Sequence, residues 1–116
     1  MKSMVKQNDL ILEIDYQGAQ AIREQFPSSI SVFILPPNKT VLRSRLEKRN
    51  TDDIATIEQR LNAASNEISH ISDYQYAIIN NNFDEALAEL VAVVKTSRLS
   101  IGYREAEEII NNFIER

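Results

Sequence analysis

The sequence predicts an α/β fold, in which short parallel strands alternate with helices. Three apolar runs indicate the strands, and the segments between and after them carry apolar residues with helical spacing. Strands that alternate with helices usually pair in parallel through right-handed crossovers. The predicted strands are Leu10–Asp15, Ser31–Leu35 and Tyr76–Ile79.

The first predicted strand, Leu10–Asp15, is mainly apolar and ends in two carboxylates. A run of this kind is typical of a strand that is buried on both faces of a parallel sheet. Glu13 and Asp15 would share one face at its carboxyl end, where open α/β sheets bind ligands. Acids placed there serve a nucleotide's base or its metal, or they are simply solvated where a strand ends. The residues alone leave both alternatives open.

The helices are predicted from apolar residues that recur every three or four positions. The first ends at Pro27, and the second follows the Pro36-Pro37 break with Asn38 as its N-cap. Asn82 indicates the cap of the fourth helix, since a glutamate follows it three positions later. The apolar residues of the last helix, within Ala106–Phe113, are expected to face inward. The predicted helices are Gln17–Phe26, Asn38–Lys48, Ile54–Ile71, Phe83–Arg98 and Tyr103–Glu115.

The composition is that of one soluble globular domain. The 116 residues are 43% hydrophobic and 26% charged, which is ordinary for such a domain. A net charge of −4 and a pI near 5.0 argue against nucleic acid or an anionic membrane as the main partner. The lack of cysteine excludes disulfides and zinc–thiolate sites, and the single histidine, His70, cannot build a histidine metal cluster. Without a secretory signal or a membrane-spanning apolar run, the expected location is cytoplasmic.

Arginines gather in the middle of the chain and are candidates for binding phosphate. Guanidinium groups contact phosphate oxygens bidentately and neutralise charge during phosphoryl transfer. Arg45 and Arg49 are four residues apart, so they would share a helix face. The alternative is a solvated helix end whose cations favour its C-terminus, and spacing alone favours this alternative. The set is Arg43, Arg45, Arg49 and Arg60.

Three consecutive asparagines follow the third predicted strand. Asn82 is explained as a helix cap and Asn81 as a turn residue. Asn80 stays open, because an amide at the carboxyl end of a strand is placed where a nucleotide's base or ribose can be hydrogen-bonded.

Five segments, taken in order, resemble guanylate kinase, the nucleoside monophosphate kinase that transfers a phosphoryl group from ATP to GMP. No single segment is specific, but their shared order is, and the resemblance spans about residues 9–95. The segments are Ile11–Gln20 (ILEIDYQGAQ), Phe33–Pro37 (FILPP), Leu42–Thr51 (LRSRLEKRNT), Arg60–Ala64 (RLNAA) and Ala77–Asp84 (AIINNNFD).

The resemblance implies a role for each candidate residue, with ATP and GMP as substrates and Mg²⁺ bound with ATP. The family carries a lid that closes over ATP, which corresponds to a segment near residues 45–60. Asp15 resembles the acid that recognises guanine. Glu13 resembles the carboxylate that contacts the metal indirectly, through water. Arg45 and Arg49 match the lid arginines that close over the ATP phosphates. Arg60 matches the arginine that holds the transferring phosphoryl group. Asn80 resembles the asparagine near adenine.

The chain also departs from the family. The only glycines are Gly18 and Gly102, and no Gly-Lys pair is present, so the phosphate-binding loop is missing. The GMP-binding subdomain is missing too. The chain therefore resembles the carboxyl-terminal half of the enzyme, with a partial P-loop nucleoside monophosphate kinase fold. Its expected parts are a strand–helix–strand core (9–37), helices with the lid segment (38–72), the last strand and helix (73–98) and a terminal helix (99–116).

A missing half has two expected consequences. The phosphate-loop strand would lie between the predicted strands Leu10–Asp15 and Ser31–Leu35, and without it their edges are unpaired. We therefore expect a homo-oligomer or strand exchange, and a chain that is inactive alone.

The alternative function is a non-catalytic guanylate-kinase-like binding or scaffold module, or a truncated remnant. The polar segment Arg49–Asp53 is expected to form a mobile flap.

Overall fold

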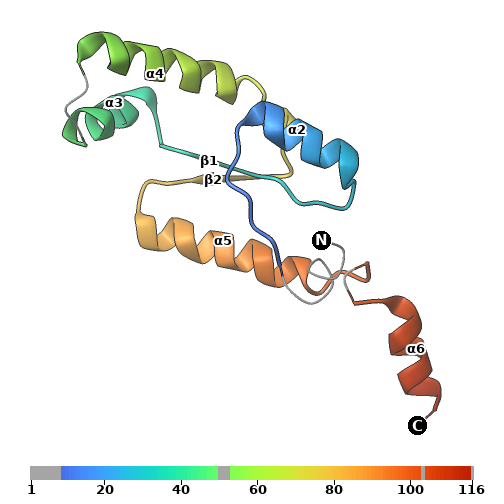
Figure 1. The fold of residues 1–116 in the computed structure, drawn as a ribbon. Coiled ribbons are helices and arrows are strands. Elements are labelled where there is room, and N and C mark those ends of the chain that lie inside the picture. The colour runs from blue at the N-terminus through green and yellow to red at the C-terminus, as the bar shows by residue number, and fades with distance from the viewer. Residues whose placement is uncertain (1–8, 50–52, 103, 116) are drawn as a thin grey trace. The chain divides into compact units, whose positions relative to one another are not determined.

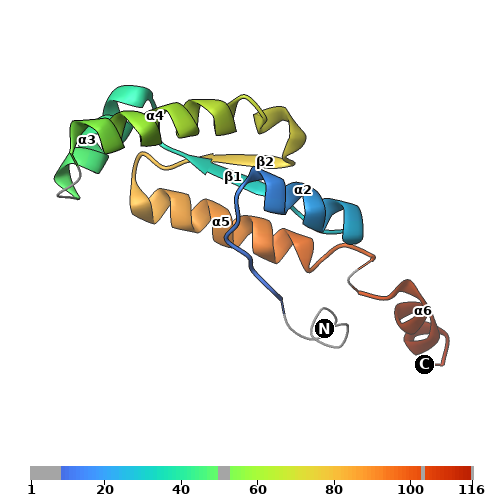
Figure 2. The same ribbon diagram turned by 45° about the horizontal axis from the view of Figure 1, so that its top comes forward.

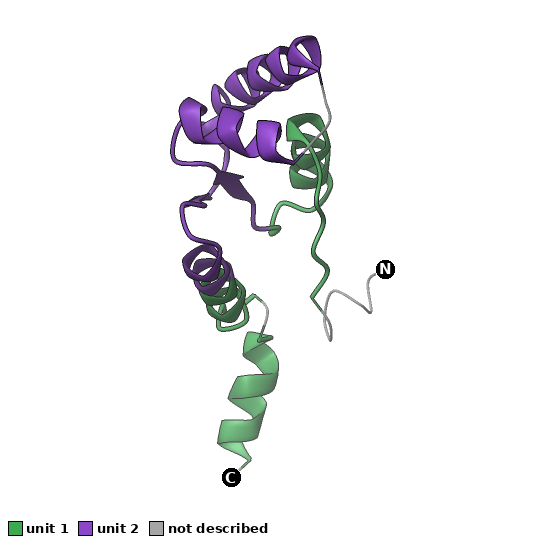
Figure 3. Ribbon diagram, turned by 90° about the vertical axis from the view of Figure 1, so that its left-hand side faces the viewer, with its two compact units in different colours: residues 1–29, 91–116 green, residues 30–90 purple. Residues whose placement is uncertain are grey.

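The computed structural model describes residues 9–49, 53–102 and 104–115 (Figure 1). The chain divides into two compact units, which are coloured separately in Figure 3. Unit 1 comprises Met1–Ser29 and Val91–Arg116, and unit 2 comprises Ile30–Leu90. Most of the predicted flap, residues 50–52, lies outside the described residues.

Unit 2 is built on two parallel strands, β1 (Val32–Leu35) and β2 (Tyr76–Ile79). They pair in register, with Val32 opposite Tyr76 and Leu35 opposite Ile79. Both strands and their parallel pairing confirm the prediction, and the α/β class with a partial nucleotide kinase fold holds. The ladder continues past β2, because the backbone N–H of Asn80 donates to the carbonyl of Leu35 at 2.7 Å.

The connection between the strands is helical, as a parallel pair requires. It contains α3 (Lys39–Lys48), α4 (Ile54–Ile68) and a short 3₁₀ turn, η1 (Ile71–Asp73), and α5 (Phe83–Ser97) follows β2. In Figures 1 and 2, α3 and α4 lie on one side of the strand pair and the first half of α5 lies on the other. The predicted helix Ile54–Ile71 therefore ends three residues early, at Ile68, and the chain continues as η1.

The core of unit 2 lies between α3 and α4. Leu46 from α3 and Ile57 from α4 are buried there, Leu61 is only 1% exposed, and Leu42 packs against them. The spacing of the α4 residues is the one that the sequence predicts for an amphipathic helix. This small core fixes the part of α3 that carries Leu42 and Leu46.

Side-chain caps define where the helices of unit 2 begin. Asn38, Asp53 and Asn82 each accept a hydrogen bond from the backbone N–H three residues later, at 2.8, 2.8 and 3.0 Å. The predicted caps at Asn38 and Asn82 are thus confirmed. The hydrogen bond from the Thr56 backbone lowers the pKa of Asp53, because it stabilises the carboxylate form.

Unit 1 contains α2 (Tyr16–Gln25), the second half of α5 and α6 (Ala106–Ile114). An ion pair between Asp9 and Arg98 joins its two stretches of chain. None of the helices within the described residues is both long and apolar enough to cross a membrane.

The predicted buried strand Leu10–Asp15 is wrong. The segment is not a strand, and its apolar side chains are exposed, with Ile11 at 70%. Among the described residues the sheet consists of β1 and β2 alone. A strand forms only where a neighbour satisfies its backbone hydrogen bonds, and here Asp15 instead starts α2.

The prediction that the last helix faces inward is also wrong. α6 begins at Ala106, and its apolar side chains are exposed, with Phe113 at 83%. Tyr103, where the helix is predicted to start, lies outside the described residues. Apolar spacing identifies an amphipathic helix, but it does not identify the surface that covers its apolar face.

We predict that Leu61→Ala lowers the free energy of unfolding by about 3 kcal/mol, because it opens a cavity between α3 and α4. Leu87→Ala on α5 is the matched control, since this leucine is exposed and its truncation removes little buried surface. Urea denaturation of both variants checks the difference. Equal losses would show that the α3–α4 contact is not the core.

Candidate functional site

Two residues that the sequence singles out meet at the carboxyl end of β2. The guanidinium of Arg45, on α3, donates to the backbone carbonyl of Asn80 at 2.8 Å and to that of Asn81 at 3.3 Å. Burial of the neighbouring Leu46 fixes this part of α3. The parallel pairing with β1 fixes the end of β2. Arg45 and Asn80 are therefore brought together by the packing of unit 2.

The charge of Arg45 is not neutralised by these contacts, because a backbone carbonyl carries only a partial charge. Arg43, two residues earlier on α3, is paired instead with the carboxylate of Glu58 on α4. The two side chains are 40% and 48% exposed, so water screens the pair and it contributes little stability, but it does offset the charge of Arg43. Of these two arginines, Arg45 is the one suited to hold an anion.

The other two predicted arginines stand on α3 and α4. Arg49 is exposed and ends α3 as its C-cap, with its backbone N–H donating to the carbonyl of Arg45 at 3.1 Å. Arg60 is exposed on α4, next to the buried Leu61. Both arginines thus stand on the helix pair whose packing also carries Arg45.

The two predicted carboxylates belong to unit 1. Asp15 is the N-cap of α2, and its Oδ1 accepts a hydrogen bond from the backbone N–H of Gly18 at 2.8 Å. Glu13 is exposed in the extended segment before it. The capping role of Asp15 was missed by the sequence reasoning. An aspartate just before a helical pattern is the signal that could have revealed it.

Gly18 leaves space beside the cap of α2. A Cβ at this position would lie 3.1 Å from the Cβ of Ile14 and 3.3 Å from Oδ1 of Asp15. Both separations are tighter than ordinary van der Waals contact, so a side chain here would require Ile14 and Asp15 to shift by a few tenths of an ångström.

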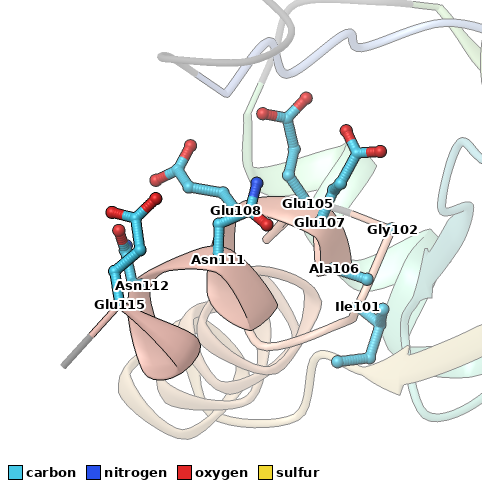
Figure 4. Close-up of a pocket in the computed structure, with 9 residues that line it drawn as sticks. All are labelled: Ile101, Gly102, Glu105, Ala106, Glu107, Glu108, Asn111, Asn112 and Glu115. Atoms are coloured by element: carbon cyan, nitrogen blue, oxygen red, sulfur yellow. The ribbon is translucent and has the colours of Figure 1, made fainter.

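A depression beside α6 is not suited to phosphate. Four of its lining residues are glutamates, Glu105, Glu107, Glu108 and Glu115, and Figure 4 shows their carboxylates along the helix. Such a negative surface repels nucleotide phosphates. Across residues 9–49, 53–102 and 104–115, no group of three or more His, Cys, Asp or Glu residues is arranged to hold a metal ion.

A parallel strand pair, a helical crossover and an arginine anchored at a strand's carboxyl end define an α/β protein with a partial nucleotide kinase fold. Comparison with known proteins identifies the family within this class. The family model described as guanylate kinase matches residues 2–97. The chain belongs to the guanylate kinase family.

Relatives named guanylate kinase match most of this chain. That of Coxiella burnetii is 47% identical over 97 residues, which covers 84% of this chain and 47% of the relative. The guanylate kinase of Alcanivorax borkumensis is 50% identical over 92 residues, which covers 79% of this chain and 44% of the relative. The chain thus spans about half the length of the curated relatives that it matches. The family match ends before α6.

We predict that Asp15→Ala destabilises α2 by about 1 kcal/mol, whereas Asp15→Asn costs only a few tenths, because asparagine caps a helix nearly as well as aspartate. Amide hydrogen exchange at Gly18 and urea denaturation measure the two effects. If asparagine cost as much as alanine, the cap would not be the structural role of this residue.

Proposed function

We propose that this chain supplies the carboxyl-terminal half of a guanylate kinase, which phosphorylates GMP to GDP with ATP. The observation that carries the proposal is the guanidinium of Arg45, which is anchored beside Asn80 by neutral carbonyl oxygens. The order of the matched segments and the absence of a Gly-Lys pair support the assignment to the carboxyl-terminal half. The other half would then contribute the phosphate-binding loop, and this chain alone would be inactive. The proposed location is the cytoplasm.

On the ATP side, Arg45 and Arg49 contact the phosphates and Asn80 lies near adenine. The contact between Arg45 and the Asn80 carbonyl supports placing both residues on the same side of the site, because it brings the guanidinium to the segment after β2. Arg60 holds the transferring phosphoryl group. Charge that spreads over this group in the transition state is stabilised by guanidinium groups that are already in place.

On the GMP side, Asp15 recognises guanine. The guanine edge presents N–H donors at N1 and N2, and a carboxylate is a matching acceptor. The cap of α2 uses one oxygen of Asp15. An ionised carboxylate has about four lone-pair sites, so the capping bond leaves acceptors for the base.

The exposed carboxylate of Glu13 fits an indirect role toward Mg²⁺. This ion prefers oxygen ligands, keeps several waters and usually binds one or two carboxylates together with substrate phosphates. An isolated acid is therefore enough where ATP supplies the remaining ligands. When bound with ATP, Mg²⁺ would offset the charge of the phosphates.

The proposal is tested by joining this chain to the part of the Coxiella burnetii guanylate kinase that it does not match. We expect the isolated chain to show no ATP:GMP phosphotransfer, and the joined protein to turn over at about 1–1000 per second. A coupled ADP assay measures both. Activity of the isolated chain would refute the half-enzyme proposal. A folded joined protein that binds GMP without turnover would favour the non-catalytic module.

The base-recognition role is tested by Asp15→Asn in the joined protein. This change keeps the helix cap but gives guanine a donor where it needs an acceptor, so we expect kcat/KM for GMP to fall about 100-fold. The KM for ATP should change less than about twofold. Equal effects on the two nucleotides would remove this role from Asp15.

The proposed incomplete sheet is tested by the oligomeric state of the isolated chain. Exposed apolar side chains in the Leu10–Ile14 segment and on β1 and β2 favour self-association through strand exchange or a homo-oligomeric contact. We expect a dimer or larger species in sedimentation velocity at micromolar concentration. A monodisperse monomer would contradict this expectation.

A further inference from the structure

The turn that follows β2 holds Arg45 by two consecutive backbone carbonyls, those of Asn80 and Asn81. Successive carbonyls of a strand point in opposite directions, so two neighbours reach one guanidinium only where the chain turns. The N–H of Asn81 donates to the carbonyl of Ile79 at 3.0 Å, which closes a three-residue γ-turn around Asn80. The backbone angle φ of Asn80 is not positive, so this is the inverse γ-turn that is common at strand ends.

Both ends of this turn are held in place. On the strand side, the N–H of Asn80 donates to Leu35 of β1 at 2.7 Å. On the helix side, the carbonyl of Asn82 accepts from the N–H of Ala86, and its Oδ1 accepts from the N–H of Glu85, both at 3.0 Å. Asn82 therefore fastens the turn to the first turn of α5.

We propose that Asn82 is a positioning residue for Arg45. By capping α5 it fixes the two carbonyls that orient the guanidinium, and so it aims Arg45 at the phosphate of a nucleoside triphosphate. The phosphate part of this inference rests on the proposed function, but the control over the orientation of Arg45 does not.

The hydrogen-bond capacity of arginine makes the arrangement workable. A guanidinium has five N–H donors, and the two carbonyls use two of them. The contacts recorded among the described residues leave three donors and the positive charge for an anion. A side chain that is already oriented loses less conformational entropy when it binds, so phosphate affinity depends on how rigidly the turn holds Arg45.

The test compares Asn82→Ala with Asn82→Ser, which restores a neutral capping oxygen. Asp53→Ala is the matched control, because it removes an equivalent cap from α4 at 2.8 Å. The measurement is the rate of rotation about the Nε–Cζ bond of Arg45, followed by NMR in the full chain. This rotation is slow while the two terminal nitrogens are bonded to separate acceptors.

We expect Asn82→Ala to speed the rotation about fivefold, which corresponds to the loss of one typical cap. Asn82→Ser should restore the slow rate, and Asp53→Ala should leave it unchanged. Unchanged rotation in Asn82→Ala, or an equal increase in Asp53→Ala, would overturn the proposal, since general destabilisation would then explain the result.

The phosphate part has its own measurement, an NMR titration with ATP of the same variants, each joined to the unmatched part of the Coxiella burnetii guanylate kinase. We expect Asn82→Ala to weaken ATP binding about fivefold and Asn82→Ser to restore it. If the joined protein without substitutions bound no ATP, the proposed ATP role of this half would fail. The rotation rates would still decide whether Asn82 positions Arg45.

Discussion

The parallel ladder between β1 and β2 is the interaction on which unit 2 depends. Two strands that run in the same direction cannot be joined by a tight turn, so the chain must leave the sheet and return. The return path is the α3–α4 pair, whose apolar contact centres on Leu61. The same pairing extends to Asn80, whose N–H bonds to β1 beyond the last paired strand residues. Arg45 can reach Asn80 because both the ladder and the helix pair are in place.

Neutral partners distinguish Arg45 from its neighbour on the same helix. Arg43 and Arg45 are two residues apart and have the same chemistry, yet one bonds a carboxylate and the other bonds carbonyl oxygens. A guanidinium can thus be oriented without being neutralised. For the proposed role in phosphoryl transfer this difference matters, because the positive charge must remain available when the anion arrives.

Local chemistry in the sequence was enough to predict much of unit 2. The caps at Asn38 and Asn82 depend on side chains only three residues from the amides that they bond, so the sequence pattern reveals them. The contact of Arg45 could not be found in this way, because its partners are backbone carbonyls, which every residue possesses. Residue chemistry singled out Arg45 and Asn80 separately, the family resemblance gave each an expected role, and the structure supplied the contact between them.

The errors in the prediction share a physical cause. The pattern of Leu10–Asp15 suits a buried strand, but a strand needs a neighbour that the local pattern cannot supply. The apolar face of α6 likewise suits a covered helix, and its side chains are exposed. In both cases the side-chain pattern describes what a segment requires of its surroundings, not what those surroundings contain.

The uncovered stretch from Leu10 to Ile14 has a consequence for the fate of the chain during synthesis. An extended apolar segment outside a folded core is what molecular chaperones bind and what quality-control proteases cut. The half-life of newly made chains would therefore be set by how soon this segment is shielded. The abundance of the chain in living cells would then depend on that shielding.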